Sequence, residues 1–107
     1  MVIIETSIFT KQIKILMDSE SYRTFQNALI VTPDMGKIIQ GSGGIRKIRW
    51  SGSGRGKRGG SRLIYYWAKN KDQIYMLYGY SKNECSDLTK EQLSIVKQVV
   101  KLEFENE

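Results

Sequence analysis

Cations dominate the side chains of this sequence that could take part in chemistry. The stretch IRKIRWSGSGRGKRGGSR, residues 45–62, holds seven Lys or Arg, of which five are Arg. The planar guanidinium group of Arg matches the oxygens of a phosphate. There is no histidine anywhere in the chain, so the usual general base near neutral pH is absent and Cys85 has no histidine to activate it. An enzyme built from these residues must position a phosphodiester and stabilise the charge on it.

The charge is distributed unevenly along the chain. Between Met35 and Lys71 there are ten Lys or Arg and no Asp or Glu, whereas the remaining residues carry seven bases and eleven acids. The net charge of +6 therefore originates in the middle third. Such a block is typical of a surface that binds a polyanion. A solvated, lysine-rich surface is the alternative, and the excess of Arg argues against it.

The glycine-rich stretch GSGRGKRGGSR, residues 52–62, does not predict a nucleotide cofactor. Its letters GRGKRG match the dinucleotide fingerprint G-x-G-x-x-G, but that motif requires a helix directly after it. Here SRLIYYW follows, which is aromatic and strand-like. A Walker loop is excluded because Lys57 is followed by Arg58 instead of Ser or Thr. No cluster of metal ligands occurs, so we predict a cofactor-free, flexible basic arm carrying Arg55, Lys57 and Arg58.

The spacing of apolar residues predicts the elements that hold this arm. Residues 2–5 read as a short strand, and Phe9, Ile13 and Leu16 mark a helix that begins near residue 7. Ser19 or Ser21 is the expected cap of a second helix, which Pro33 and Gly36 terminate. Residues 45–50, 62–67 and 73–80 are expected strands, with a turn at 69–72.

A final helix completes the predicted fold. Thr89 and Gln92 form a capping box, and one apolar face follows it, made of Leu93, Val96, Val100 and Phe104. The predicted order is β-α-α-β-β-β-α. This order indicates one α+β domain over residues 1–107, with a mostly antiparallel, four-stranded sheet, two N-terminal helices and a C-terminal helix.

Strand alternation brings the cations together. Arg62 and Tyr66 share one face of their strand, and Lys47 and Arg49 share one face of the preceding strand. If the two strands pair, cations converge beside aromatic rings, as single-stranded RNA requires. Core packing of each tyrosine and a surface ion pair of Arg62 remain the alternatives. The predicted RNA-binding residues are Arg46, Arg55, Arg58, Tyr66 and Tyr80.

Three motifs give the chain a resemblance to a known family. These are QGSGGIRKIR (residues 40–49), GKRGGSRLIYY (56–66) and YSKNE with DLT (80–89). In this order and spacing they resemble the HigB-type branch of the RelE/ParE toxin superfamily, the toxins of bacterial type II toxin–antitoxin pairs. The resemblance implies a RelE-like fold and a metal-independent, ribosome-dependent endoribonuclease that cuts mRNA. It also implies a cognate HigA-like antitoxin, the ribosome and mRNA as partners.

The resemblance also implies roles for individual residues. Arg62 matches the strand arginine that stabilises the scissile phosphate, and Lys57 matches the lysine of the G-K-R-G-G motif. Lys47 and Arg49 match the basic pair on the preceding strand, one member of which lowers the pKa of the attacking 2′-hydroxyl. Lys82 and Asn83 match a segment that supplies a late acid or phosphate contact. This chain lacks the arginine, tyrosine and histidines that some relatives use there, which leaves Lys82 and Tyr80 as candidate proton donors.

Two other functions remain open from the sequence. ParE-like members of the superfamily poison DNA gyrase without cutting RNA, and a non-catalytic RNA- or DNA-binding module would use RGKRGG as an RGG-like arm. The single cysteine requires no oxidising compartment, and no apolar run approaches the roughly 20 residues that cross a bilayer. The cytoplasm is therefore the expected location, with no membrane partner.

Overall fold

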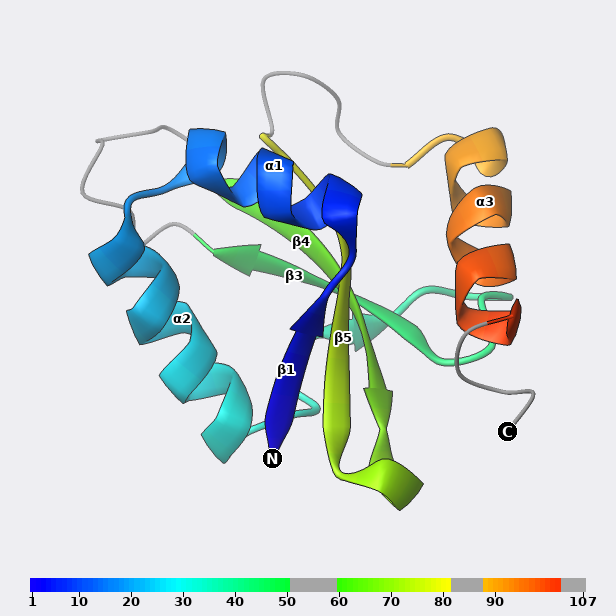
Figure 1. Ribbon diagram of the computed structural model, residues 1–107. Coiled ribbons are helices and arrows are strands. Elements are labelled where there is room, and N and C mark those ends of the chain that lie inside the picture. The colour runs from blue at the N-terminus through cyan, green and yellow to red at the C-terminus, as the bar shows by residue number, and fades with distance from the viewer. Residues whose placement is uncertain (51–59, 82–87, 103–107) are drawn as a thin grey trace.

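A five-stranded sheet with helices on both faces forms the body of the protein (Figure 1). The computed structural model describes residues 1–50, 60–81 and 88–102. The elements, in chain order, are β1 (Val2–Glu5), α1 (Ser7–Leu16), α2 (Ser19–Val31), β2 (Lys37–Ile38), β3 (Ile45–Trp50), β4 (Ser61–Ala68), a 3₁₀ turn (Lys69–Lys71), β5 (Gln73–Ser81) and α3 (Lys90–Val100).

The sheet has the strand order β1-β5-β4-β3-β2. β1 pairs with β5 in parallel, and all the other neighbours are antiparallel. The predicted α+β class is therefore confirmed, as are the three long strands. The predicted strand number was too low by one, because β2 consists of two exposed residues and is too short for any alternation to show in the sequence.

The two faces of β4 are buried under different helices. Leu63 and Tyr65 belong to a core with α1 and α2, whereas Ile64 belongs to a core with Val96 and Val100 of α3. Residues 61–65 are all buried, which makes β4 the central strand of the fold. Side chains on β3 and β4 consequently face either the α1/α2 side or the α3 side, and their parity along the strand decides which.

Helix α1 packs close to β5 because Gly79 has no side chain. A Cβ atom on Gly79 would lie 3.0 Å from Leu16 Cδ1 and 3.3 Å from Leu63 Cδ2. The backbone N–H of Gly79 donates to Gln12 Oε1 at 2.7 Å, which fixes α1 to the strand. This contact holds the end of β5 that lies next to Arg62 in the sheet.

Side-chain caps define where the helices begin. Thr6 accepts from the backbone N–H of Phe9, and the predicted Thr89–Gln92 capping box is present. Asp18 caps α2 by accepting from the N–H of Ser21, so the prediction of Ser19 or Ser21 as the cap was wrong. A carboxylate at this position also complements the positive end of the helix dipole. None of the described helices has the length and hydropathy to cross a membrane.

Glu5 ties the first strand to the two N-terminal helices. Its carboxylate accepts hydrogen bonds from Tyr22 Oη at 2.5 Å and from Thr10 Oγ1 at 2.7 Å. Burial, together with the hydrogen bond to Glu5, raises the pKa of Tyr22 well above its ordinary value, so Tyr22 stays a donor at any physiological pH. This network anchors the α1/α2 side of the sheet.

Tyr65 anchors the segment that leads from α2 into the sheet. Its hydroxyl donates to the carbonyl of Pro33 at 2.7 Å and accepts from the N–H of Gly36 at 2.9 Å. A Cβ atom on Gly36 would lie 2.8 Å from the Tyr65 ring, so glycine is required there. Burial raises the pKa of Tyr65, which keeps the hydroxyl protonated.

We predict that Tyr65→Phe lowers the free energy of unfolding by about 1–3 kcal/mol, because the N–H of Gly36, in a buried hydrogen bond, and the part-buried carbonyl of Pro33 both lose their partner. Urea denaturation measures the change. Tyr66→Phe is the control, since no hydrogen bond of the Tyr66 hydroxyl occurs within the described residues, and it should change stability little. Equal effects of the two substitutions would contradict this role of Tyr65.

Candidate active site

The register between β3 and β4 brings three predicted site residues to one place. Arg49 pairs with Arg62 across the two strands, and Lys47 pairs with Ile64. Ile64 lies in the core under α3, so all of these side chains are on the α3 side of the sheet. The predicted convergence of Lys47, Arg49 and Arg62 is therefore present in the structure. We call these three residues the cation cluster.

The cation cluster sets two like charges directly opposite each other. Cβ atoms of directly opposed residues lie about 5 Å apart, and like charges in this arrangement are destabilising. Arg62 is 8% exposed whereas Arg49 is exposed, so one guanidinium is held by the protein and the other reaches solvent. An anion placed between them would remove the repulsion and accept hydrogen bonds from both groups. The pair therefore offers two neighbouring guanidinium groups to an anion.

Two tyrosines of β5 continue the same rows of the sheet. Tyr80 pairs with Arg62, and Tyr78 pairs with Ile64; their ring centroids lie 6.2 Å apart. Tyr80 is 2% exposed and packs in the α3-side core. Contrary to the prediction, its ring is therefore not open for stacking on a base. Tyr78 is half-buried and was not predicted, although the same two-residue alternation places it on this face.

The structure separates Arg46 and Tyr66 from the cation cluster. Arg46 pairs with Tyr65 on the α1/α2 side, and its Nη1 donates to the carbonyls of Gly36 at 2.8 Å and Asp34 at 3.3 Å. Tyr66 is on the α3 side, but it is four residues from Arg62 along β4, which corresponds to about 13 Å. Arg46 alternates with Lys47 and Arg49 along β3 and therefore lies on the opposite face from both.

The remaining predicted residues lie outside the described part of the chain. These are Arg55, Lys57, Arg58, Lys82 and Asn83. Trp50, Ser61 and Ser81 occupy one row at the end of the sheet where Arg49 and Arg62 are found. Gly60 is buried with φ +66°, a conformation that favours glycine, and it leads the chain into β4 one residue before Ser61.

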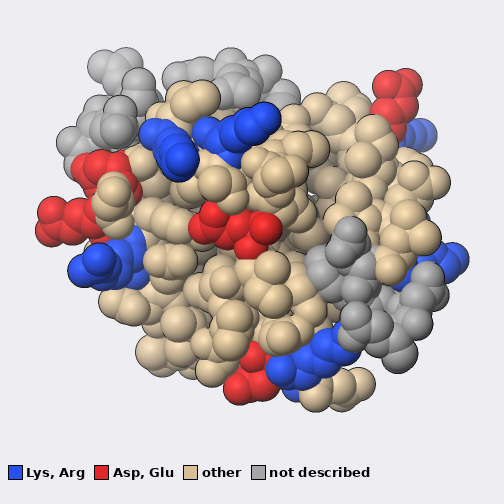
Figure 2. Space-filling model, in the orientation of Figure 1, with Lys and Arg blue, Asp and Glu red and all other residues tan. Residues whose placement is uncertain are grey.

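The chemistry available at this site is charge stabilisation. No group of three His, Cys, Asp or Glu that could hold a metal occurs within residues 1–50, 60–81 and 88–102. On the face that Figure 2 draws, acidic and basic side chains are interspersed. In the cation cluster, by contrast, two arginines and a lysine lie on one face. Arg49 is paired with Arg62, and Lys47 is two residues from Arg49 along β3.

Comparison with known proteins gives one family and one fold. A family model described as "RelE toxin of RelE / RelB toxin-antitoxin system" matches residues 9–106. The chain is also similar to the free-state structure of the Escherichia coli toxin RelE carrying two arginine-to-alanine substitutions. The TM-score is 0.57 at 15% sequence identity, and the match covers 79% of this chain and 86% of that one. At this identity the likeness supports the shared fold.

We predict that inorganic phosphate raises the melting temperature of the protein through the cation cluster. Phosphate at ten times its dissociation constant would stabilise the folded state by about 1.4 kcal/mol, or several degrees in a domain of this size. Arg49→Gln should reduce this rise in melting temperature by more than half. Arg49 is exposed, so its side chain can be replaced without disturbing the core. Arg23→Gln, an exposed position on α2, should leave the rise unchanged. An undiminished rise with Arg49→Gln would show that phosphate binds elsewhere.

Proposed function

The chain belongs to the RelE toxin family of toxin–antitoxin systems, and we propose that it is a ribosome-dependent endoribonuclease that cuts mRNA and thereby inhibits translation. The observation that supports this proposal is the opposed Arg49–Arg62 pair, with Lys47 two residues from Arg49 along β3 and on the same face. Such an arrangement suits a phosphodiester whose negative charge increases during the reaction.

The proposed reaction is attack of a ribose 2′-hydroxyl on its neighbouring phosphate. A bond forms between the 2′-oxygen and phosphorus, and the bond from phosphorus to the 5′-oxygen breaks. The 2′-hydroxyl loses its proton, and the leaving 5′-oxygen gains one. The products are a 2′,3′-cyclic phosphate, which can open to a 3′-phosphate, and a free 5′-hydroxyl.

The residues of the cation cluster divide this work. Arg62 is held rigidly and donates to the non-bridging oxygens as the phosphorane dianion forms. Lys47 or Arg49 lowers the pKa of the attacking 2′-hydroxyl by placing a positive charge beside the developing oxyanion. Lys57 adds a phosphate contact. Lys82 is the candidate donor to the 5′-oxygen, and Asn83 is a further phosphate contact. Tyr80 is buried and is given no contact with the RNA.

The absence of histidine explains why a ribosome would be needed. Cations lower the barrier by stabilising charge, but they do not hold an extended RNA with its 2′-oxygen in line with the bond that breaks. A partner that fixes this geometry converts an inefficient catalyst into an effective one, since orientation alone contributes many orders of magnitude. The ribosome provides such a fixed mRNA.

We further propose a cognate antitoxin of the HigA type, following the motifs that resemble the HigB branch, and a cytoplasmic site of action. The family supports an antitoxin partner in general. An antitoxin inhibits the toxin if it covers the cation cluster or any surface needed to enter the ribosome.

We predict that Arg62→Ala reduces mRNA cleavage in a translating extract about 10²–10³-fold, because the dianion loses its buried donor. Arg62→Lys should recover only part of the rate, since an ammonium lacks the guanidinium fork. Primer extension on a defined message measures cleavage, and circular dichroism verifies folding. Arg23→Ala on α2 is the control and should cleave normally.

Three outcomes would contradict parts of this assignment. Full cleavage by folded Arg62→Ala would remove Arg62 from the catalytic residues. Intact mRNA in the presence of the unmodified protein, together with impaired DNA supercoiling, would identify a gyrase-poisoning toxin. RNA binding without cleavage on ribosomes would identify a non-catalytic RNA-binding module.

A further inference from the structure

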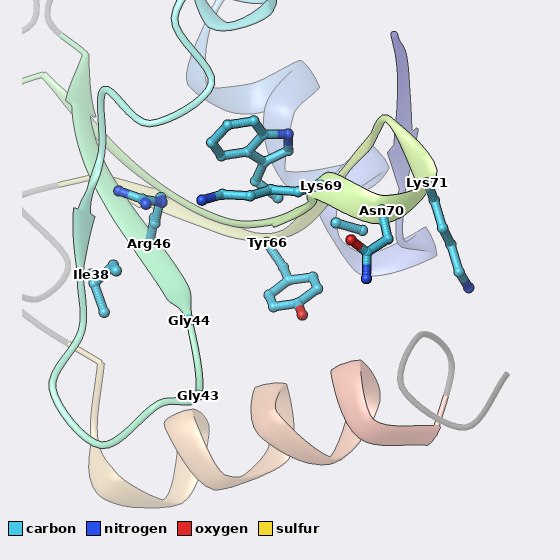
Figure 3. A pocket seen from close by; sticks show the side chains of 10 residues that line it. Ile38, Gly43, Gly44, Arg46, Tyr66, Lys69, Asn70 and Lys71 are labelled. Atoms are coloured by element: carbon cyan, nitrogen blue, oxygen red, sulfur yellow. The ribbon is translucent and has the colours of Figure 1, made fainter.

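Two hollows of the surface meet at Gly43. The first, of about 390 Å³, lies between the loop before β3 and the turn after β4, and Gly43 and Gly44 form part of its wall (Figure 3). The second, of about 410 Å³, runs along α3 from Lys90 to Lys101 and also has Gly43 in its wall. The two hollows together form one surface, which we call the Gly43 surface.

The lining of the Gly43 surface is basic and free of acids. Its cations are Arg46, Lys69, Lys71, Lys90, Lys97 and Lys101. Among the described residues, no Asp or Glu lines either hollow. Figure 3 shows the side chains of Arg46 and Lys69 extending toward each other across the first hollow. This lining contrasts with the mixed charges on the face drawn in Figure 2.

The lysines of α3 form a row. Lys97 and Lys101 follow Lys90 by seven and eleven positions, so all three fall within about 40° around the helix axis, and the row is about 16 Å long. All three are exposed. Like charges in a row repel one another, and within residues 90–101 no acid lies three or four positions from any of these lysines. A linear polyanion lying along α3 would satisfy the whole row.

The loop at the centre of the Gly43 surface has a fixed shape. Ser42 is buried; its Oγ accepts from the N–H of Ile45 at 3.0 Å and donates to the carbonyl of the same residue at 3.2 Å. The N–H of Ser42 donates to the carbonyl of Ile39 at 3.1 Å. Gly43 has φ +79°, and a Cβ atom there would meet nothing within 4 Å. The backbone between the two hollows is therefore open to a ligand.

We propose that the Gly43 surface binds the phosphate backbone of RNA away from the scissile linkage. This inference rests on the proposed RNA-cleaving function but concerns different residues. The first hollow also contains groups suited to nucleotides: the amide of Asn70, the ring of Tyr66, and Trp67 with Lys69 Nζ 4.9 Å from its centroid. Within the described residues the buried Nε1 of Trp67 has no hydrogen-bond partner. Cations beside aromatic and amide groups favour RNA over an acidic protein segment.

Helix α3, which carries this row, covers the side of the sheet that the cation cluster faces. Lys90 is at the start of α3, the element that follows β5, and β5 ends at Ser81 in the row next to Arg62. From Lys90 the lysines lead to the Gly43 loop. The RNA bound there is either the mRNA flanking the cleavage site or the RNA of the ribosome, and both present the same phosphates.

Gly43→Asp and Gly43→Asn give a matched test of this inference. Both residues tolerate positive φ and both fit the open space, so they differ only in a negative charge at the centre of the surface. Binding of the full-length protein is measured to vacant ribosomes and to an unstructured 20-nucleotide RNA. Gly43→Asp should weaken binding at least fivefold relative to Gly43→Asn. Gly41→Asp and Gly41→Asn control for position, because Gly41 has φ +75° and open space but lines neither hollow.

A charge-removal variant provides the second measurement. Lys90→Ala, Lys97→Ala and Lys101→Ala combined should lower the slope of log affinity against log salt by roughly two to three, one counterion for each lost phosphate contact. The combination of Lys11→Ala, Lys14→Ala and Arg23→Ala removes the same charge from exposed positions of α1 and α2 and should leave the slope unchanged.

The pattern of losses identifies the source of the RNA. Weaker binding to ribosomes alone indicates that the surface contacts ribosomal RNA. Weaker binding to the oligonucleotide alone indicates that it contacts the mRNA flank. Either result supports the inference. Unchanged binding to both RNAs would overturn the inference. Weakened binding to the purified antitoxin alone would also overturn it, because the surface would then be a protein-binding surface. These comparisons need no cleavage, so failure of the proposed ribonuclease activity would be seen separately, as intact mRNA with the unmodified protein.

Discussion

The antiparallel register of β3 and β4 is the constraint on which the candidate site depends. It sets Arg49 opposite Arg62 and turns both toward α3. A slip by one residue would move these side chains to opposite faces and send Leu63 out of its core. Register is held by burial on both faces of β4, where Leu63 and Tyr65 pack under α1 and α2 while Ile64 packs under α3. The hydrophobic core therefore determines where the cations meet.

At this site apolar packing stabilises the sheet, whereas repulsion between two arginines destabilises it. Two directly opposed arginines are an unfavourable pair in a sheet, and the apolar packing of β4 on both faces sets the register that places them opposite each other. This is the arrangement expected where a protein accepts local instability in order to bind a charged ligand. Because Arg62 is nearly buried, its guanidinium has few alternative conformations. A donor that is already in position loses little entropy when an anion arrives.

Much of this arrangement was predictable from the sequence, for identifiable reasons. The alternation in residues 62–67 and the Thr89–Gln92 capping box are local signals, and both predictions were confirmed. β2 was missed because two residues carry no period, and Asp18 was missed as a cap because two serines lay nearby. The burial of Tyr80 was not predictable, since strand parity gives the face of a residue but not the helix that covers it. The Gly43 surface joins residues 43, 69 and 97, whose proximity is purely tertiary.

Glycine serves three different physical purposes in this basic region. Gly36 and Gly79 allow close approach of a tyrosine ring and a helix, respectively, and both support the sheet that carries the cation cluster. Gly60 provides a left-handed turn into β4. A Cβ atom on Gly43 would meet nothing within 4 Å, although the loop is fixed by the hydrogen bonds of Ser42. A side chain at Gly43 would occupy the space between two acid-free hollows, so here glycine keeps a surface open instead of allowing the chain to pack.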